Sequence, residues 1–163
     1  MELFKTILVP YDLMKSSDRA LEYAANLAIL SNDCHIIILH VISTFPIKRP
    51  HPRGERIISS ASADSLQRIY HELEMNASKI LDTKKEDLRM KNFSTSTHIA
   101  VADNAAKKIV EYAKKHGVDL IVMNSRSTAP KNRIKGLLWF PLGSVSRNVS
   151  EMAPCPVLLI RPT

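Results

Sequence analysis

Short apolar runs alternate along this chain with longer segments in which apolar residues recur at helical spacing. Five runs have the length and the β-branched content of buried strands, and they cover residues 3–9, 35–42, 93–100, 119–123 and 156–160. Four segments with a helical apolar stripe lie between them, at residues 16–30, 63–90, 104–116 and 144–152. Because strands joined by helices need crossover connections, the pattern predicts a parallel sheet. We therefore expect an α/β fold, a doubly wound open sandwich with helices on both faces.

Turn and cap signals bound these elements. Pro10 ends the first run, and residues 16–18 (Ser-Ser-Asp) offer N-caps for the first helix. The run at 93–100 alternates apolar and hydroxyl residues, which predicts a strand near an edge of the sheet. Two segments rich in basic residues, 43–62 and 124–142, interrupt the pattern and are interpreted as loops.

The composition is that of an ordinary globular chain. Apolar residues make up 45% of its 163 residues, charged residues make up 24%, and the mean hydropathy is −0.09, which argues against both disorder and a membrane span. The length fits one domain, which we expect over residues 1–163. The beginning of the sequence lacks the pattern of a secretory signal, so we expect a cytoplasmic location. Cys34 and Cys155 have no metal-binding or redox spacing, and we expect both to be packed as small hydrophobic residues.

The net charge narrows the choice of partner. Lysine and arginine outnumber aspartate and glutamate by 23 to 16, which gives a formal charge of +7 and favours an anionic partner. A nucleotide phosphate, a nucleic acid and an acidic protein all remain open on charge alone. The sequence has no basic surface interleaved with aromatic residues and no known nucleic-acid-reading helix, so nucleic acid is the least favoured of the three.

Polar residues follow the predicted strands where a ligand would bind. In sheets of this kind, ligands bind beyond the carboxyl ends of the strands, at the point where the strand order reverses. Asp12 follows the first strand and could accept hydrogen bonds from ribose hydroxyls or an adenine amino group, or help to hold a divalent cation such as Mg²⁺. Its alternative role is to cap the loop that follows.

The segment Gly143-Ser144-Val145-Ser146 opens the last predicted helix. Gly143 would let a phosphate approach the backbone, and the first amides of the helix, together with the helix dipole, would attract an anion. The hydroxyls of Ser144 and Ser146 would add donors. The alternative is that Ser144 only caps the helix and Gly143 eases the turn.

Motifs for catalysis are missing from the sequence. It contains no Gly-x-Ser-x-Gly elbow, no Gly-x-x-x-x-Gly-Lys-Ser/Thr loop and no Gly-x-Gly-x-x-Gly fingerprint. We do not predict an enzyme, and any slow ATP hydrolysis would depend on positioning and a metal ion.

Four blocks of the sequence, in this order, resemble a universal stress protein. They are KTILVPYD, ILHVIS, HGVDLIVM and GLLWFPLGSVSRNVSEMAPCPVLLIRP, and together they extend over nearly the whole chain. The last block is the most specific, with Gly-Ser-Val-Ser followed by Ala-Pro-Cys-Pro-Val before the final strand. The resemblance implies a Rossmann-like, five-stranded parallel sheet and a homodimer that pairs through the C-terminal strand, residues 156–160. One branch of that family binds ATP or a related adenine nucleotide, and another branch does not.

The resemblance also implies the binding residues of the nucleotide-binding branch. The adenosine would contact four residues after the first two strands: Pro10, Tyr11, Asp12 and Val41. The pocket would continue through the end of the fourth strand and its loop, at Met123, Asn124 and Ser127. The phosphates would contact the start of the last helix, at Gly143, Ser144, Val145 and Ser146.

The chain departs from the glycine pattern of that branch. Asn124 and Ser127 stand where the first two glycines belong, and fifteen residues instead of nine separate Ser127 from Gly143. The side chains of Asn124 and Ser127 could obstruct a phosphate, and neither has the conformational freedom of glycine. Inserted basic residues of the same loop could instead contact the phosphates, namely Lys131, Arg133 and Lys135.

Two functions therefore remain open. The first is a dimeric, nucleotide-responsive stress or regulatory protein that binds ATP or AMP, with or without Mg²⁺. The second is a universal stress protein without a nucleotide, which works as a protein–protein interaction module. The second would be indicated by a crevice filled by the side chains of residues 124–135.

Overall fold

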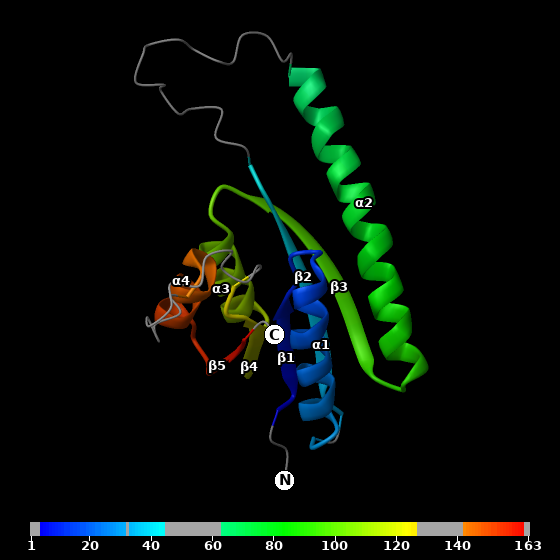
Figure 1. Cartoon of the computed structure of the whole chain (residues 1–163), viewed down its shortest axis with the longest axis vertical. Coiled ribbons are helices and arrows are strands. Elements are labelled where there is room, and N and C mark those ends of the chain that lie inside the picture. Colours follow the sequence, from blue (N-terminus) through cyan, green and yellow to red (C-terminus); the bar gives the residue numbers. More distant parts are fainter. Residues whose placement is uncertain (1–3, 32, 45–62, 127–141, 162–163) are drawn as a thin grey trace, which may run out of the picture.

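A five-stranded parallel sheet forms the centre of the structure, with strand order β3-β2-β1-β4-β5 (Figure 1). The structure is a computed structural model that describes residues 4–31, 33–44, 63–126 and 142–161. The strands are β1 (Thr6–Pro10), β2 (His35–Ser43), β3 (Ser94–Ala102), β4 (Leu120–Asn124) and β5 (Val157–Ile160). Every neighbouring pair is parallel, and β3 lies at an edge as its hydroxyl-rich sequence predicts. The predicted α/β fold class is confirmed.

Two helices pack against each face of the sheet. The helices are α1 (Lys15–Ala28), α2 (Ala63–Met90), α3 (Ala105–Lys115) and α4 (Ser144–Met152). Helices α1 and α2 cover one face, and α3 and α4 cover the other, as Figure 1 shows. Each helix is the crossover between two parallel strands, which is why the chain alternates strand and helix throughout.

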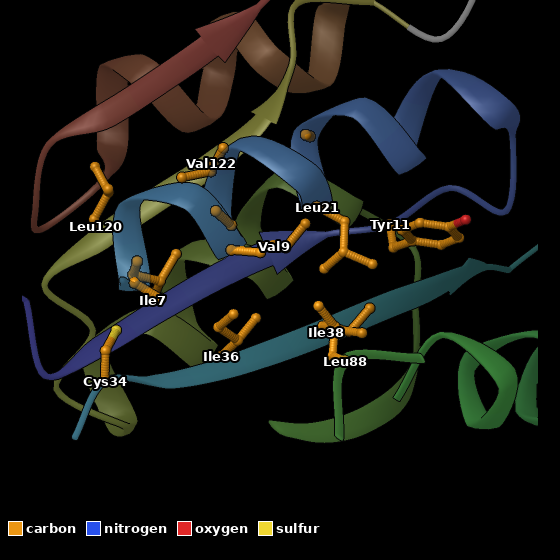
Figure 2. Packing of buried hydrophobic residues seen from close by; sticks show 14 of the residues in the cluster. Ile7, Val9, Tyr11, Leu21, Cys34, Ile36, Ile38, Leu88, Leu120 and Val122 are labelled. Carbon is orange, nitrogen blue, oxygen red and sulfur yellow. The ribbon is translucent and has the colours of Figure 1, made fainter. Parts of the chain in front are cut away.

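The side chains of each strand alternate between two hydrophobic cores. In β1, Ile7 and Val9 pack towards α1, whereas Leu8 packs towards α3 and α4. Figure 2 shows the first of these cores, in which Ile36 and Ile38 of β2 lie beside the side chains of β1. Since both faces of the central strands are covered, consecutive residues are apolar, and this produces the short continuous runs in the sequence.

The two cysteines belong to these cores. Cys34 is buried beneath α1, Cys155 packs against the opposite core, and both are free thiols. Burial, and to a lesser degree the nearby carboxylate of Asp119, raises the pKa of both thiols. The prediction that they are packed as small hydrophobic residues is confirmed.

Helix α1 begins in a different way from the prediction. Its N-cap is Met14, which makes no side-chain capping bond, so the expectation of a cap within residues 16–18 is wrong. The carboxylate of Asp12 accepts a hydrogen bond from the Met14 amide at 3.0 Å and closes a tight turn before the helix. Leu13, inside that turn, has a φ of 66°. An acceptor just before the helix therefore takes the place of a cap within residues 16–18.

Only the second half of α2 packs on the sheet. Ala77, Leu81 and Leu88 are buried, whereas no residue from 65 to 76 is. The N-terminal half extends past the end of the sheet in Figure 1. Of the predicted apolar stripe, only the later part therefore joins the core, whereas Ile69 and Leu73 are exposed.

Asp119 ties the amino ends of β1 and β4 together. Its Oδ2 accepts hydrogen bonds from the amides of Lys5 and Thr6 at 2.8 and 2.9 Å, and its own amide donates to the Thr6 carbonyl at 2.9 Å. These bonds set the start of the pairing between the two strands on either side of the point where the strand order reverses.

Removing this carboxylate should weaken the sheet measurably. We expect Asp119→Ala to lower the free energy of unfolding by about 1–2 kcal/mol, because two amides lose a charged acceptor and water replaces it only in part. Urea unfolding followed by circular dichroism measures the change. Asp119→Asn keeps an acceptor oxygen and should lose less, and an alanine variant as stable as the original chain would contradict this role.

Candidate functional site

A hollow of about 380 Å³ opens at the carboxyl ends of β1, β2 and β4, beside the start of α4. The strand order reverses between β1 and β4, so the hollow lies where ligands bind in this class of sheet. Ten of the eleven residues predicted to bind a nucleotide line it: Pro10, Tyr11, Asp12, Val41, Met123, Asn124, Gly143, Ser144, Val145 and Ser146. The eleventh, Ser127, and the predicted phosphate contacts Lys131, Arg133 and Lys135 lie outside the described residues.

A larger, open hollow of about 860 Å³ lies between α1 and α2, beside the amino ends of β2 and β3. None of the predicted site residues lines it. Both volumes fall within the range of about 300–1,000 Å³ that is common for ligand pockets. The smaller hollow is the candidate site because it joins the carboxyl ends of three strands to the start of a helix.

The carboxylate of Asp12 is held by short local contacts. Its Oδ1 accepts a hydrogen bond from the Ser17 hydroxyl at 2.5 Å and a second from the Met14 amide at 3.0 Å. The Asp12 amide in turn donates to the Ser17 hydroxyl at 3.2 Å. The capping role that the sequence left as an alternative is therefore present, and both capping bonds go to one oxygen of the carboxylate.

Asn124 does not obstruct the hollow in the way that its replacement of a glycine suggested. Its side chain is 8% exposed, and its amide nitrogen donates to the Ser17 hydroxyl at 3.4 Å. It is a β4 residue and is not among the described residues with a positive φ, so the backbone needs no glycine there. The residues of the 124–135 segment that the structure describes, 124–126, leave the hollow open.

The start of α4 carries amides without a side-chain cap. The N-cap is Gly143 rather than Ser144, and the first intrahelical bond runs from the Arg147 amide to the Gly143 carbonyl at 3.0 Å. The amides of the first turn, at residues 144–146, therefore precede the helical hydrogen-bond ladder. The alternative in which Ser144 caps the helix is wrong.

The Ser146 hydroxyl is not a donor to the hollow. Ser146 is buried, and its hydroxyl donates to the Ser125 carbonyl at 2.6 Å. The Gly143 carbonyl, at 3.0 Å, is a second acceptor for the same hydroxyl. This bond fastens the helix start to the residue after β4. Of the two serine hydroxyls expected to add donors, only that of Ser144, which is exposed, remains available to a ligand.

Tyr11 lines the hollow, but its ring belongs to the core on the opposite face, as Figure 2 shows. Its hydroxyl donates to Asp18, which is also paired with Lys84 at 2.8 Å. Burial, followed by this bond and the charge of Asp18, raises the pKa of Tyr11 well above its ordinary value. Tyr11, which the resemblance places at the adenosine, therefore lines the hollow while its ring packs in the core.

Four polar residues that line the hollow were not among the predicted set: Ser17, His40, Ser43 and Arg126. Nδ1 of His40 donates to the Tyr11 carbonyl at 2.8 Å, which leaves Nε2 as the nitrogen that a ligand could use. Arg126 is the only lysine or arginine among the described residues that line the hollow. His40 lies near the end of β2 and Arg126 shortly after β4, and these positions are the signal that could have identified them.

A large part of the lining is apolar. Leu39, Val41, Ile109 and Met123 come from β2, α3 and β4. An apolar lining with a few polar groups is typical of pockets that bind a flat organic ring together with a charged group.

Two further searches concern the described part of the chain alone. No group of three or more histidine, cysteine, aspartate or glutamate side chains there is arranged to hold a metal ion. No helix in that part combines the length and the hydropathy that crossing a membrane requires.

Comparison of the sequence with known proteins identifies a family. The sequence profile of the Universal stress protein family matches residues 3–161. The chain belongs to this family. The universal stress protein YxiE of Bacillus subtilis is 32% identical over 159 residues, which is 98% of this chain and 100% of that protein.

Solved universal stress proteins share the fold. The structure of UspA from Lactobacillus plantarum superposes with a TM-score of 0.75 at 23% identity, over 96% of this chain and 97% of that one. A universal stress protein from Archaeoglobus fulgidus, solved in complex with dAMP, has a TM-score of 0.60 at 19% identity over 97% and 98% of the two chains. A protein of this family from Arabidopsis thaliana, solved with AMP bound, has a TM-score of 0.64 at 17% identity over 98% and 92%.

Alkaline unfolding tests the placement of the Tyr11 ring. Folding raises the pKa of Tyr11, so above pH 10, roughly its unfolded value, the unfolded chain releases a proton that the folded chain retains, and stability falls. We expect the urea midpoint to fall more steeply above that pH in the original chain than in Tyr11→Phe, which cannot ionise. Equal pH dependence in the two proteins would show that the hydroxyl is not buried.

The close approach at Gly143 gives a second test. A Cβ at this position would lie 3.3 Å from the Ser125 carbonyl oxygen and 3.5 Å from Cα of Arg126, while its φ of −61° suits any residue. We expect Gly143→Ala to lower the free energy of unfolding by less than about 1 kcal/mol, and Gly143→Val by about 1–3 kcal/mol, because the added atoms push the helix start away from β4. Thermal unfolding of the three proteins measures these losses. A valine variant as stable as the original chain would refute the close contact.

Proposed function

We propose that this protein binds an adenine nucleotide, ATP or AMP, in the hollow between Asp12 and the first turn of α4. The observation that supports it most is that a carboxylate, an apolar lining and the uncapped amides of a helix start border one hollow. Two relatives in the same family hold AMP and dAMP, which adds support from outside this chain.

The adenosine part of the ligand uses the strand ends. The base packs against the apolar lining, with Val41 and Met123 as the nearest predicted contacts. The ionised carboxylate of Asp12 can only accept hydrogen bonds, and the two hydroxyls of a ribose can donate them, so we assign the sugar to Asp12. The contacts of Asp12 with Ser17 and Met14 both go to Oδ1, which leaves Oδ2 to a donor outside that network.

The phosphates use the start of α4. Three amides at residues 144–146 and the positive end of the helix dipole favour an anion there. Arg126 adds a cationic side chain at the same hollow. Lys131, Arg133 and Lys135 remain predicted contacts. If Mg²⁺ accompanies the nucleotide, Asp12 would be its candidate protein ligand, and the ion would offset part of the phosphate charge.

Binding of this kind suits a nucleotide-responsive regulator in the response to stress. The site as described has groups that bind and orient a nucleotide but no activated nucleophile, so we do not propose catalysis as its role. The cytoplasmic location stays a prediction of the sequence.

Calorimetric titration with AMP and ATP, with and without Mg²⁺, tests the proposal. We expect saturable heat from at least one of them, and an affinity about tenfold lower or worse for Asp12→Ala, since the ribose loses a charged acceptor. Asp33→Asn, a surface carboxylate at the opposite end of the sheet, is the matched control and should bind like the original chain. No heat from either nucleotide at millimolar concentration would end the proposal.

Arg126→Ala separates phosphate binding from base and sugar binding. We expect it to weaken ATP and AMP by about 5–30-fold, because a charge-assisted contact is lost, and to leave adenosine unchanged. A competition assay with the three ligands measures this. Equal weakening of adenosine and ATP would place Arg126 elsewhere in the site.

The homodimer expected through residues 156–160 also stays a proposal. Strand β5 lies at an edge of the sheet, Leu158 is 36% exposed, and an open edge can pair with a second copy. Light scattering after size exclusion should give twice the mass of one chain for the original protein and the mass of one chain for Leu158→Asp. A monomeric original protein would rule out this dimer.

A further inference from the structure

The Ser17 hydroxyl lies where three elements of the site meet. Ser17 is in the first turn of α1 and is 2% exposed, and its hydroxyl contacts Asp12 after β1 and Asn124 at the end of β4. Three hydrogen bonds converge on this one oxygen: it accepts from the Asp12 amide and from the Asn124 side chain, and it donates to Oδ1 of Asp12.

These three bonds fix the direction of the hydroxyl proton. A serine hydroxyl has two lone pairs and one proton. The amide of Asp12, at 3.2 Å, and the side-chain amide of Asn124, at 3.4 Å, are both N–H donors and occupy the lone pairs. The proton is therefore left to point at Oδ1 of Asp12, at 2.5 Å, and the bond to the carboxylate is a charge-assisted one.

The same bonds orient the carboxylate. Oδ1 receives the Ser17 proton and the Met14 amide from two directions, which fixes the rotation of the Asp12 side chain. The carboxylate then presents Oδ2 to donors outside the network. A glycine at position 124 would leave one lone pair of Ser17 without its donor and would let the hydroxyl turn away.

We propose that Ser17 and Asn124 are positioning residues that hold the Asp12 carboxylate towards the ribose hydroxyls and so make the site selective for a sugar that carries them. The inference rests on the proposed nucleotide binding and adds that the site recognises the ribose hydroxyls of the ligand. It also gives Asn124 a function in place of the glycine that the nucleotide-binding branch of the family has at this position.

The test compares AMP with 2′,3′-dideoxy-AMP, which keeps the base and the phosphate but lacks both sugar hydroxyls. We expect the original chain to bind AMP about tenfold or more tightly, since a hydrogen bond to a charged acceptor is worth that factor. Ser17→Ala and Asn124→Leu should each weaken AMP and leave dideoxy-AMP nearly unchanged, so that the ratio of the two dissociation constants falls towards one. The ratio is insensitive to partial misfolding, because a smaller folded fraction weakens both ligands equally.

Further variants separate positioning from general stability. Ser17→Thr keeps the hydroxyl and should keep the ratio. In Asp12→Ala the ratio should already be lost, and adding Ser17→Ala to it should change the ratio no further. Ser31→Ala is the matched control, because it removes a buried hydroxyl that accepts from the Phe4 amide at the far end of the sheet and should leave the ratio unchanged.

The outcomes for this inference and for the proposed function are distinct. If the original chain binds neither nucleotide, the proposed function fails and this inference fails with it. If it binds AMP but Ser17→Ala and Asn124→Leu weaken both ligands equally, nucleotide binding stands and the positioning role is refuted. If the original chain binds both ligands equally well, Asp12 does not read the sugar, and this inference is wrong.

Discussion

The pairing of β1 with both β2 and β4 is the constraint on which the rest of this structure depends. The chain crosses from β1 to β2 over one face of the sheet and from β3 to β4 over the other, so the connections on either side of β1 diverge. The divergence leaves a hollow above the carboxyl ends of β1 and β4, which α1 borders at one side and α4 at the other. Asp119 at the amino ends and the Ser125–Ser146 contact at the carboxyl ends fasten the two strands and α4 in this arrangement.

Much of this arrangement follows from the sequence, because the apolar pattern and the strand ends are local signals. The order of elements, the edge position of β3 and the residues that follow β1 and β4 could all be predicted. The directions of the side chains within the site were harder to predict from the sequence. Along β1, Ile7 and Val9 face α1, so Tyr11 continues on that face and its ring leaves the hollow. Applying the same alternation at Tyr11 would have predicted this, had the face of each residue been known.

Other features depend on contacts between segments that are distant in the sequence. The Ser146 hydroxyl bonds to the carbonyl of Ser125, twenty-one positions earlier, and Asn124 bonds to Ser17, 107 positions earlier. A pattern read within one helix or one loop assigns such hydroxyls to caps or to a ligand, because the actual acceptor lies outside the window. The prediction of a cap for α1 failed for a different, local reason, since the acceptor Asp12 lies before the helix and not within it.

The side chain that replaces the first glycine of the family pattern does not close the hollow. The side chain of Asn124 lies beneath the site and joins a buried network, so this substitution is compatible with an open hollow. The hollow then offers one carboxylate, one arginine and a helix start, arranged around an apolar lining. The physical idea behind the proposed function is that the sheet brings an acceptor for a sugar and donors for a phosphate to opposite walls of one space.

The amide chemical shifts of the isotope-labelled protein during a titration with AMP test that idea most directly. We expect saturable shifts at Asp12, at Val41 and at the first amides of α4, residues 144–146, all with one dissociation constant, while the amides around Asp119 stay unchanged. Shifts confined to the larger hollow between α1 and α2, or the absence of any saturable shift, would contradict the account.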